Sequence, residues 1–276
     1  MRNQRRRLFN RLMIGVVTGC AALSVGIMFL IIGYVTAKGV THISVTFLTH
    51  EPTSLGEPGG GIKHALVGTL ILVTIAISIA VPLGIGAGIF VSEYASPRLA
   101  LPLRFLADVL TGVPSIVIGV FIYSLIVIQY GFSALAGGVA LAVIMLPIVA
   151  RTSEEALYLV PRDQREAALA LGTPKWRMIL QIVLPTAAPA VVTGCLLATA
   201  RAAGETAPLL FTALGNNFYS TNVKEPIAAM PVIIYRYALT PYPSLHDQAW
   251  ATAFILVGVM LVLSAITRIV VSRSIR

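Results

Sequence analysis

The sequence contains few charged residues for its length. Asp, Glu, Lys and Arg make up only 11% of its 276 residues, and hydrophobic residues make up 57%. An ordinary soluble domain is roughly 25% charged, so this scarcity, with a mean hydropathy of +0.88, excludes a soluble globular protein. The apolar runs are also too long for the alternating strands of an outer-membrane barrel. Because helices satisfy their own backbone hydrogen bonds in lipid, we expect an all-α membrane protein.

Cysteines and ligand-binding patterns are scarce too. The two cysteines, Cys20 and Cys195, both lie inside apolar runs, which predicts small buried hydrophobic residues rather than a disulfide. The four histidines have no metal-ligand spacing, so we expect no metal site. The sequence has no Gly-x-x-x-x-Gly-Lys-Ser/Thr phosphate loop, which excludes ATP binding of that kind.

The basic residues do not form a nucleic-acid-binding surface. The formal net charge is +9, but no single basic stripe with interleaved aromatic residues is present, as such a surface would need. The lysines and arginines instead cluster at the ends of apolar runs, where lipid headgroups and membrane topology explain them.

Apolar runs predict six membrane-spanning helices, since a bilayer core needs about 20 apolar residues per helix. Residues 109–150 contain no charge and are too long for one span, so we divide them at Gln129-Tyr130-Gly131 and Gly137-Gly138. Asp108 would then stand at the start of the third helix, either as a charge favourable to the helix dipole or as a transport residue. The other expected spans are 12–35, 65–92, 178–200 (a run that can continue past Arg201) and 248–267. The first run has no cleavage site after it, so we interpret it as a retained anchor.

The distribution of lysine and arginine predicts the topology. With the amino terminus in the cytoplasm, fifteen basic residues fall in cytoplasmic segments and four in outer ones, as the positive-inside rule expects. Both termini are then cytoplasmic, including a basic segment at residues 1–11. Two outer loops are expected, at about 36–64 and 210–247. The second is rich in aromatic residues and forms either an interfacial aromatic belt or a docking surface for an external partner.

Residues 151–181 are the only large polar stretch on the predicted inner side. The sequence predicts a first short helix that ends at Gly172, as glycine ends helices at the C′ position. Thr173 then caps a second short helix, with Pro174 as its first residue. The alanines beside Glu166 leave a smooth helix surface, and Trp176 offers an aromatic anchor of the kind enriched at interface centres.

This stretch resembles a motif of ABC-importer permeases. Glu166-Ala167-Ala168, Gly172 and the ending Ile182-Val183-Leu184-Pro185 match the spacing of the EAA box of bacterial importers. The resemblance implies that residues of about 160–180 form a coupling helix seated in a groove of an ATP-hydrolysing subunit. The residues expected to take part are Arg165, Glu166, Ala167, Ala168, Gly172 and Trp176.

Arg201 and Glu205 lie beyond a full span of apolar residues. Their i,i+4 spacing puts them on one face of a continuous helix. Charges at membrane depth are costly and mark a pathway by default. Two interpretations remain. The pair is either an ion pair that fixes helix packing, or an oxyanion site in which the planar guanidinium binds the anion and Glu205 holds the guanidinium or adjusts how tightly the anion binds.

The surrounding residues resemble the phosphate-specific family of importer permeases. Ala200-Arg201-Ala202-Ala203-Gly204-Glu205-Thr206 looks like its signature, and the continuation Ala207-Pro208-Leu209-Leu210-Phe211 points to the PstA type. The segment 112–119 is similar to one shared by both permease types. The resemblance implies a substrate path of Arg201, Glu205, Thr206 and Ser115. From the residues alone, Ser115 and Thr111 either bind the anion or pack helices together.

The resemblance also implies the assembly and the mechanism. The chain would be a single six-helix domain, residues 1–276, with the type I ABC-importer permease fold, and not itself an enzyme. It would pair with a PstC-type permease, a PstB-type ATPase dimer that binds ATP and Mg, and an external phosphate-binding protein in the periplasm or outside the cell, and work in the cell membrane by alternating access. Alternatives are an importer of another oxyanion (sulfate, molybdate or phosphonate), an ATP-independent secondary carrier, or a phosphate-sensing scaffold.

Overall fold

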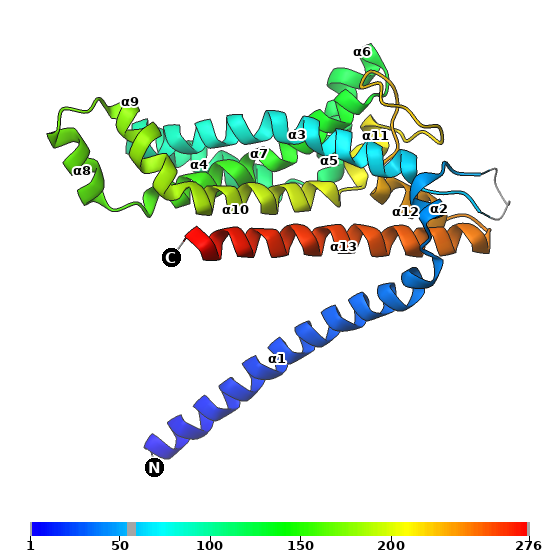
Figure 1. The fold of residues 1–276 in the computed structure, drawn as a ribbon. Coiled ribbons are helices and arrows are strands. Elements are labelled where there is room, and N and C mark those ends of the chain that lie inside the picture. Colours follow the sequence, from blue (N-terminus) through cyan, green and yellow to red (C-terminus); the bar gives the residue numbers. More distant parts are fainter. Residues whose placement is uncertain (1, 54–58, 275–276) are drawn as a thin grey trace.

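The structure, a computed structural model, describes residues 2–53 and 59–274 as an elongated helical bundle (Figure 1). The described residues form helices and no strand. The helices are, in chain order, α1 (Arg2–Gly39), η1 (Val40–His42), α2 (Val45–Thr49), α3 (Lys63–Ile89), η2 (Phe90–Tyr94), α4 (Pro97–Gly112), α5 (Ser115–Ile122), η3 (Tyr123–Val127), α6 (Ile128–Tyr130), α7 (Ala134–Tyr158), α8 (Arg162–Ala170), α9 (Lys175–Met178), η4 (Ile179–Val183), α10 (Leu184–Ala203), α11 (Ala207–Thr212), α12 (Met230–Ala238) and α13 (Pro243–Ser274).

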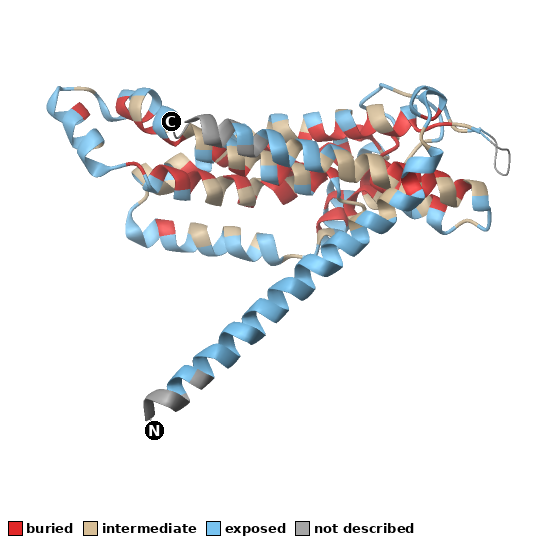
Figure 2. Ribbon diagram, turned by 60° about the horizontal axis from the view of Figure 1, so that its bottom comes forward, coloured by how far each residue is buried: buried red, intermediate tan, exposed pale blue. Residues whose placement is uncertain are grey.

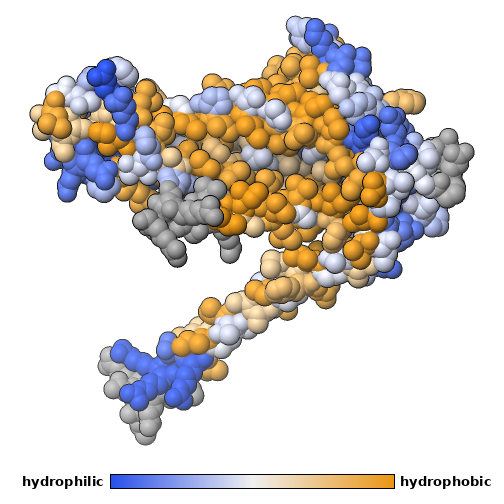
Figure 3. Space-filling model, in the orientation of Figure 1, coloured by the Kyte–Doolittle hydropathy of each residue, from blue (hydrophilic) through white to orange (hydrophobic). Residues whose placement is uncertain are grey.

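Five helical segments of the described chain are long and apolar enough to cross a membrane, and a bent pair can make a sixth. The five are Phe9–His42, Lys63–Tyr94, Ala134–Tyr158, Lys175–Ala203 and Pro243–Ile266. The all-α membrane fold and the spans expected at 12–35, 65–92, 178–200 and 248–267 are confirmed. Figure 3 shows apolar residues gathered along the middle of the bundle, with hydrophilic residues at its ends and at the start of α1.

The third span is bent, which the sequence analysis did not predict. Helices α4 and α5 meet at an angle of 97°. The cause is Pro114, because proline disfavours helical geometry in the residue before it. Val113 and Pro114 are both extended, with ψ angles of 130° and 132°. Asp108 therefore stands near the end of α4 and not at the start of a helix, so its assignment as a favourable N-terminal charge was wrong.

Gly137 and Gly138 lie inside α7 and not in a turn. The chain reverses instead at Gly131, whose φ of 82° suits glycine. A Cβ on Gly137 would stand 2.7 Å from a methyl carbon of Leu72, and one on Gly138 would stand 2.5 Å from Ile75. The absent side chains therefore serve close packing of α3 on α7, as small residues do between membrane helices.

The core of the bundle is formed by α3, α7 and α10. Their buried residues are apolar and include both small and large side chains, among them Leu72, Ala76, Leu141, Met145 and Ala198. In Figure 2 the buried residues concentrate in these helices, while α1 and much of α4 are exposed. The spans thus divide into an inner group that is packed within the chain and outer helices that are not.

Helix α1 leaves the bundle at an oblique angle (Figure 1). None of its most apolar stretch is buried within the chain. It touches α13 only near its own end, where the rings of Tyr34 and Trp250 meet edge to face at 5.3 Å. Its start and the end of α13 both point toward the end of the bundle that carries α8 and α9.

Candidate functional site

Arg201 and Glu205 lie where α10 breaks before α11. Arg201 is in the last turn of α10, which ends at Ala203, and Gly204 is the capping residue. The helix cannot run on because Pro208 follows, and a proline ring clashes with the carbonyl four residues earlier. Glu205 and Thr206 therefore lie in a short break, which we call the helix break (residues 204–206). The expected continuous helix face is absent.

The two charges nevertheless remain neighbours across the end of α10. Arg201 Nε lies 3.9 Å from Glu205 Oε1, and the side chains are 53% and 17% exposed. At that distance they form an ion pair but no hydrogen bond. The pair is therefore loose, with the guanidinium mostly open and the carboxylate mostly covered.

The polar side chains at the helix break make no hydrogen bond within the described chain, a state they share with Ser92 and Ser153 but not with most hydroxyls of the spans. Most hydroxyls inside the helices donate to a carbonyl one turn earlier; those of Thr74, Thr111 and Thr199 are examples. The structure gives no hydrogen bond within the described chain to the side chains of the four predicted path residues, Arg201, Glu205, Thr206 and Ser115. These groups remain available to a ligand or to another chain.

The structure brings these four residues together only in part. Thr206 follows Glu205 directly, and the next residues form α11. Ser115 begins α5, which packs on α11 so closely that a Cβ on Gly119 would stand 2.7 Å from Pro208. No contact given for the described residues joins Ser115 to Arg201. The hydroxyl of Thr111 already bonds the Ala107 carbonyl at 2.9 Å, so of the two hydroxyl candidates only Ser115 is free.

The other predicted site, the coupling helix expected at about residues 160–180, stands at one end of the bundle (Figure 1). We call residues 161–178 the EAA segment. Helix α8 ends as the sequence predicts. Gly172 has a φ of 77°, its N–H donates to the Leu169 carbonyl at 3.0 Å, and the Thr173 N–H donates to the Ala168 carbonyl at 3.2 Å. These two bonds are the Schellman pattern of a helix end closed by glycine.

The start of the second short helix differs from the prediction by one residue. Pro174 is the capping residue and Lys175 the first helical residue, and no side chain caps the helix. Thr173 is therefore not an N-cap. The Schellman bonds explain this, because they place the Thr173 backbone in the ending of α8.

The EAA segment presents an exposed apolar surface. Ala168 packs inward against the ends of α7 and α10, whereas Glu166 and Ala167 are exposed. Leu171 is 86% exposed and Trp176 55% exposed. An apolar surface on a charged, water-facing end is typical of a protein-docking site.

Arg165 faces inward, unlike its neighbours in the EAA segment. Its side chain is 18% exposed and forms an ion pair of 2.8 Å with Glu93, which is 7% exposed. Its guanidinium also donates to the carbonyls of Val160 and Leu157 at 2.8 and 2.7 Å. These carbonyls lie at the end of α7, where helices leave acceptors unsatisfied.

Two acidic residues that the sequence analysis did not single out form buried ion pairs. Glu93 is one. Glu154 is the other: it binds Arg104 of α4 and Arg151 of α7, and Arg151 also reaches Asp108 at 3.2 Å. Both glutamates lie at the end of long apolar runs, and only 11 residues of the chain are acidic. That scarcity is the signal that could have pointed to them.

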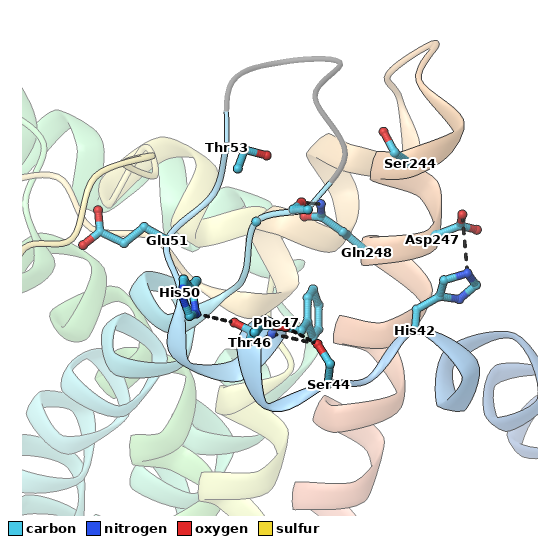
Figure 4. Close-up of a pocket in the computed structure, with 12 residues that line it drawn as sticks. His42, Ser44, Thr46, Phe47, His50, Glu51, Thr53, Ser244, Asp247 and Gln248 are labelled. Carbon is cyan, nitrogen blue, oxygen red and sulfur yellow. Dashed lines mark hydrogen bonds and ion pairs between the residues drawn. The ribbon is translucent and has the colours of Figure 1, made fainter.

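A polar cavity of about 590 Å³ lies at the opposite end, between the chain after α1 and the start of α13 (Figure 4). His42 and Asp247 pair across it at 3.5 Å. Gln248 is 8% exposed; its amide donates to the Gly59 carbonyl at 2.7 Å, and its oxygen has no partner. No group of three or more metal-ligating side chains occurs among the described residues.

Comparison with known proteins gives one matching family model over most of the chain. Residues 80–276 match the model described as "Binding-protein-dependent transport system inner membrane component". The matched part contains both the EAA segment and the helix break.

Relatives match almost the entire chain. A phosphate transport system permease protein PstA of Yersinia pestis is 42% identical over 97% of this chain and 92% of its own length. One from Haemophilus influenzae is 41% identical over 96% of this chain and 94% of its own. A probable PstA protein of Methanocaldococcus jannaschii is 34% identical, with 93% and 91% covered.

Solved ABC importers share the fold. A bacterial ABC transporter involved in the import of the acidic polysaccharide alginate aligns over 97% of this chain and 99% of its own, with a TM-score of 0.62 and 16% identity. An inward-facing MetNI methionine ABC transporter aligns over 78% and 95%, with a TM-score of 0.61 and 19% identity. At these identities the likeness concerns the fold alone.

Proposed function

The chain belongs to the family of binding-protein-dependent transport system inner membrane components, and from that premise we propose that it is the transmembrane subunit of an ATP-driven importer of inorganic phosphate. The observation that carries the proposal is the relation to phosphate transport permeases over 97% of the chain at 42% identity. The fold of an ABC-importer permease agrees with it.

The helix break is the part of the chain suited to phosphate. A guanidinium presents a planar fork of donors that matches a tetrahedral oxyanion, and that of Arg201 has no hydrogen-bond acceptor in the described chain. Glu205 holds it only at 3.9 Å. A site that transports must release its ion as well as bind it, and a guanidinium balanced between a carboxylate and an anion can do both.

A second permease chain would complete the path. Arg201 lies 53% exposed on the surface of a single chain, and a bare arginine facing lipid is costly. Leu101, Phe105 and Phe121 on the bent span are also exposed. We infer that a PstC-type partner covers this surface, so that phosphate passes between two chains. Helix α1, unburied in its own chain, would face lipid or that partner.

The two ends of the bundle would contact the other components. Glu166, Leu171 and Trp176 of the EAA segment would dock into a PstB-type ATPase dimer, which binds ATP and Mg; the present chain supplies no catalytic group. The polar cavity beside His42 would receive the external phosphate-binding protein. The EAA segment is then cytoplasmic, and both termini, which point toward the same end, are cytoplasmic with it.

In this mechanism, closure of the ATPase dimer moves the EAA segment. The motion passes through α7 and α10, which leave that segment directly, and changes which side of the membrane the helix break faces. Alternating exposure of Arg201 would then carry phosphate inward.

The substrate is tested with the complete importer in proteoliposomes. We expect uptake of labelled phosphate that requires ATP and the binding protein and persists in excess sulfate or molybdate. Uptake of sulfate or molybdate in place of phosphate would reject phosphate as the substrate, while the assignment as an ATP-driven importer would stand. Phosphate uptake that follows an ion gradient without the ATPase would overturn the importer itself.

A further inference from the structure

The EAA segment contacts a span, that of α3, which is not its neighbour in the sequence. It joins α7 and, through η4, α10 in the chain, but Glu93 at the end of the α3 span is 72 residues away from Arg165. Only one residue of α8, Ala168, is buried, so apolar packing does little to fix how α8 is held. The orientation of α8 therefore depends on its polar contacts.

Glu93, at the cytoplasmic end of the α3 span, is contacted by both short helices of the EAA segment, α8 and α9. Arg165 of α8 donates to its carboxylate at 2.8 Å. Lys175 of α9 donates to its backbone carbonyl, and the ammonium of Lys175 also lies 4.7 Å from the centre of the Tyr94 ring. We call this set of contacts the Glu93 clamp.

The ion pair at the centre of the clamp, between Arg165 and Glu93, is buried. The side chains of Arg165 and Glu93 are 18% and 7% exposed. Replacing one member of a buried pair leaves the other charge without a partner, which is strongly unfavourable. The pair also borders a cavity of about 320 Å³ that is lined by Glu166. It thus lies beside the surface that would meet the ATPase.

Behind the clamp, α3 is packed tightly on α7. A Cβ on Gly84 would stand 2.7 Å from Val149, and one on Gly88 would stand 2.7 Å from Ser153. Helices in such contact move together, because close-packed interfaces do not deform continuously. A displacement delivered to Glu93 would therefore reach the inner group of spans as a rigid body.

We propose that Glu93 is a positioning residue that links the ATPase-driven motion of the EAA segment to the α3 span. It does so by holding Arg165 through its carboxylate and Lys175 through its carbonyl. The inference rests on the proposed function, since it concerns how that importer couples ATP hydrolysis to transport. Without the clamp, α8 would still bind the ATPase, but its motion would reach the packed α3–α7 pair only through the connecting residues 159–161.

The test compares phosphate uptake with ATP hydrolysis in the complete importer, reconstituted in proteoliposomes with labelled phosphate. The variant is Glu93→Gln, which keeps the shape and removes the charge. Its matched control is Glu155→Gln, because Glu155 is exposed and pairs with Arg151 only at 3.7 Å. We expect phosphate transported per ATP hydrolysed to fall about tenfold in Glu93→Gln, within the usual range of coupling between sites, and to stay unchanged in the control.

A merely structural role would lower the amount of assembled importer and leave that ratio at the wild-type value, which would overturn the proposal. If Glu93→Gln does not assemble, Lys175→Met removes the second contact without leaving a buried charge, and the same ratio is expected to fall by a smaller factor. An unchanged ratio in Lys175→Met would then reject the clamp. Absence of phosphate uptake in the wild type would reject the proposed function instead, so the two failures are distinct.

Discussion

Two arginine–glutamate pairs in this chain use the same groups in opposite ways. Arg165 and Glu93 are buried, 2.8 Å apart, and the guanidinium also binds two carbonyls. Arg201 and Glu205 are 3.9 Å apart, and the arginine is mostly exposed. The first pair is fixed within the fold, and the second leaves its donors free. The difference teaches that the environment, and not the residue types, separates a structural ion pair from an exchangeable site.

The largest expected difference between the pairs concerns stability. Arg165→Gln should lower the free energy of unfolding by about 3 kcal/mol, because it leaves Glu93 buried without a partner. Glu205→Gln should change it by less than about 1 kcal/mol, because its carboxylate forms only a loose pair, at 3.9 Å, with a mostly exposed guanidinium. Thermal unfolding of the two purified variants in detergent measures both, and equal losses would remove the distinction between the pairs.

A conservative change at the loose pair should affect transport rather than stability. Arg201→Lys keeps the charge but loses the planar fork. Phosphate uptake should fall about tenfold, because one charge-assisted hydrogen bond contributes about 1.5 kcal/mol. Initial uptake rates at equal amounts of assembled importer measure it. Wild-type rates would mean that the guanidinium does not bind the ion.

The EAA segment, which contains Arg165, also depends on the backbone conformation of Gly172. Gly172→Ala should cost about 1 kcal/mol, since φ is positive there, and should weaken co-purification of the ATPase. Gly86→Ala is the control, because Gly86 lies in α3 with open space around its Cα. Equal ATPase recovery in both variants would show that the end of α8 tolerates another geometry.

The smallest effects are expected from the free hydroxyls. Ser115→Ala and Thr206→Ala should each raise the phosphate concentration for half-maximal uptake roughly threefold, the effect of about 0.6 kcal/mol for one hydrogen bond. Thr111→Ala should leave it unchanged, because its hydroxyl bonds the Ala107 carbonyl. A larger effect at Thr111 than at Ser115 would reverse the assignment.

Much of the fold could be predicted because lipid imposes simple rules. Charge-free runs of sufficient length located five spans, and the spacing around Gly172 located the end of α8. The bend at Pro114 was missed because the apolar run around it is continuous, and hydropathy does not detect a change of direction. Gly137 and Gly138 were misinterpreted because close packing and turns both favour glycine.

The functional residues, too, were predicted from the sequence only in part. Arg201 and Glu205 were found because charges beyond a full apolar span are rare, and four residues separate them. Glu93 was missed because its partner Arg165 is 72 residues away, so its position at the end of a long apolar run did not reveal a buried ion pair. The sequence also did not predict that the Arg165 side chain points inward, because this orientation depends on carbonyls at the end of another helix.

The most direct test of the central claim is labelled-phosphate uptake by the complete importer carrying Arg201→Gln. The matched control is Arg98→Gln, an exposed arginine of α4 for which the structure gives no ion pair within the described chain. The account predicts that uptake falls to background in Arg201→Gln and stays at the wild-type rate in the control, with equal assembly in both. Normal phosphate uptake by an assembled Arg201→Gln importer would contradict it and make the loose pair a packing contact.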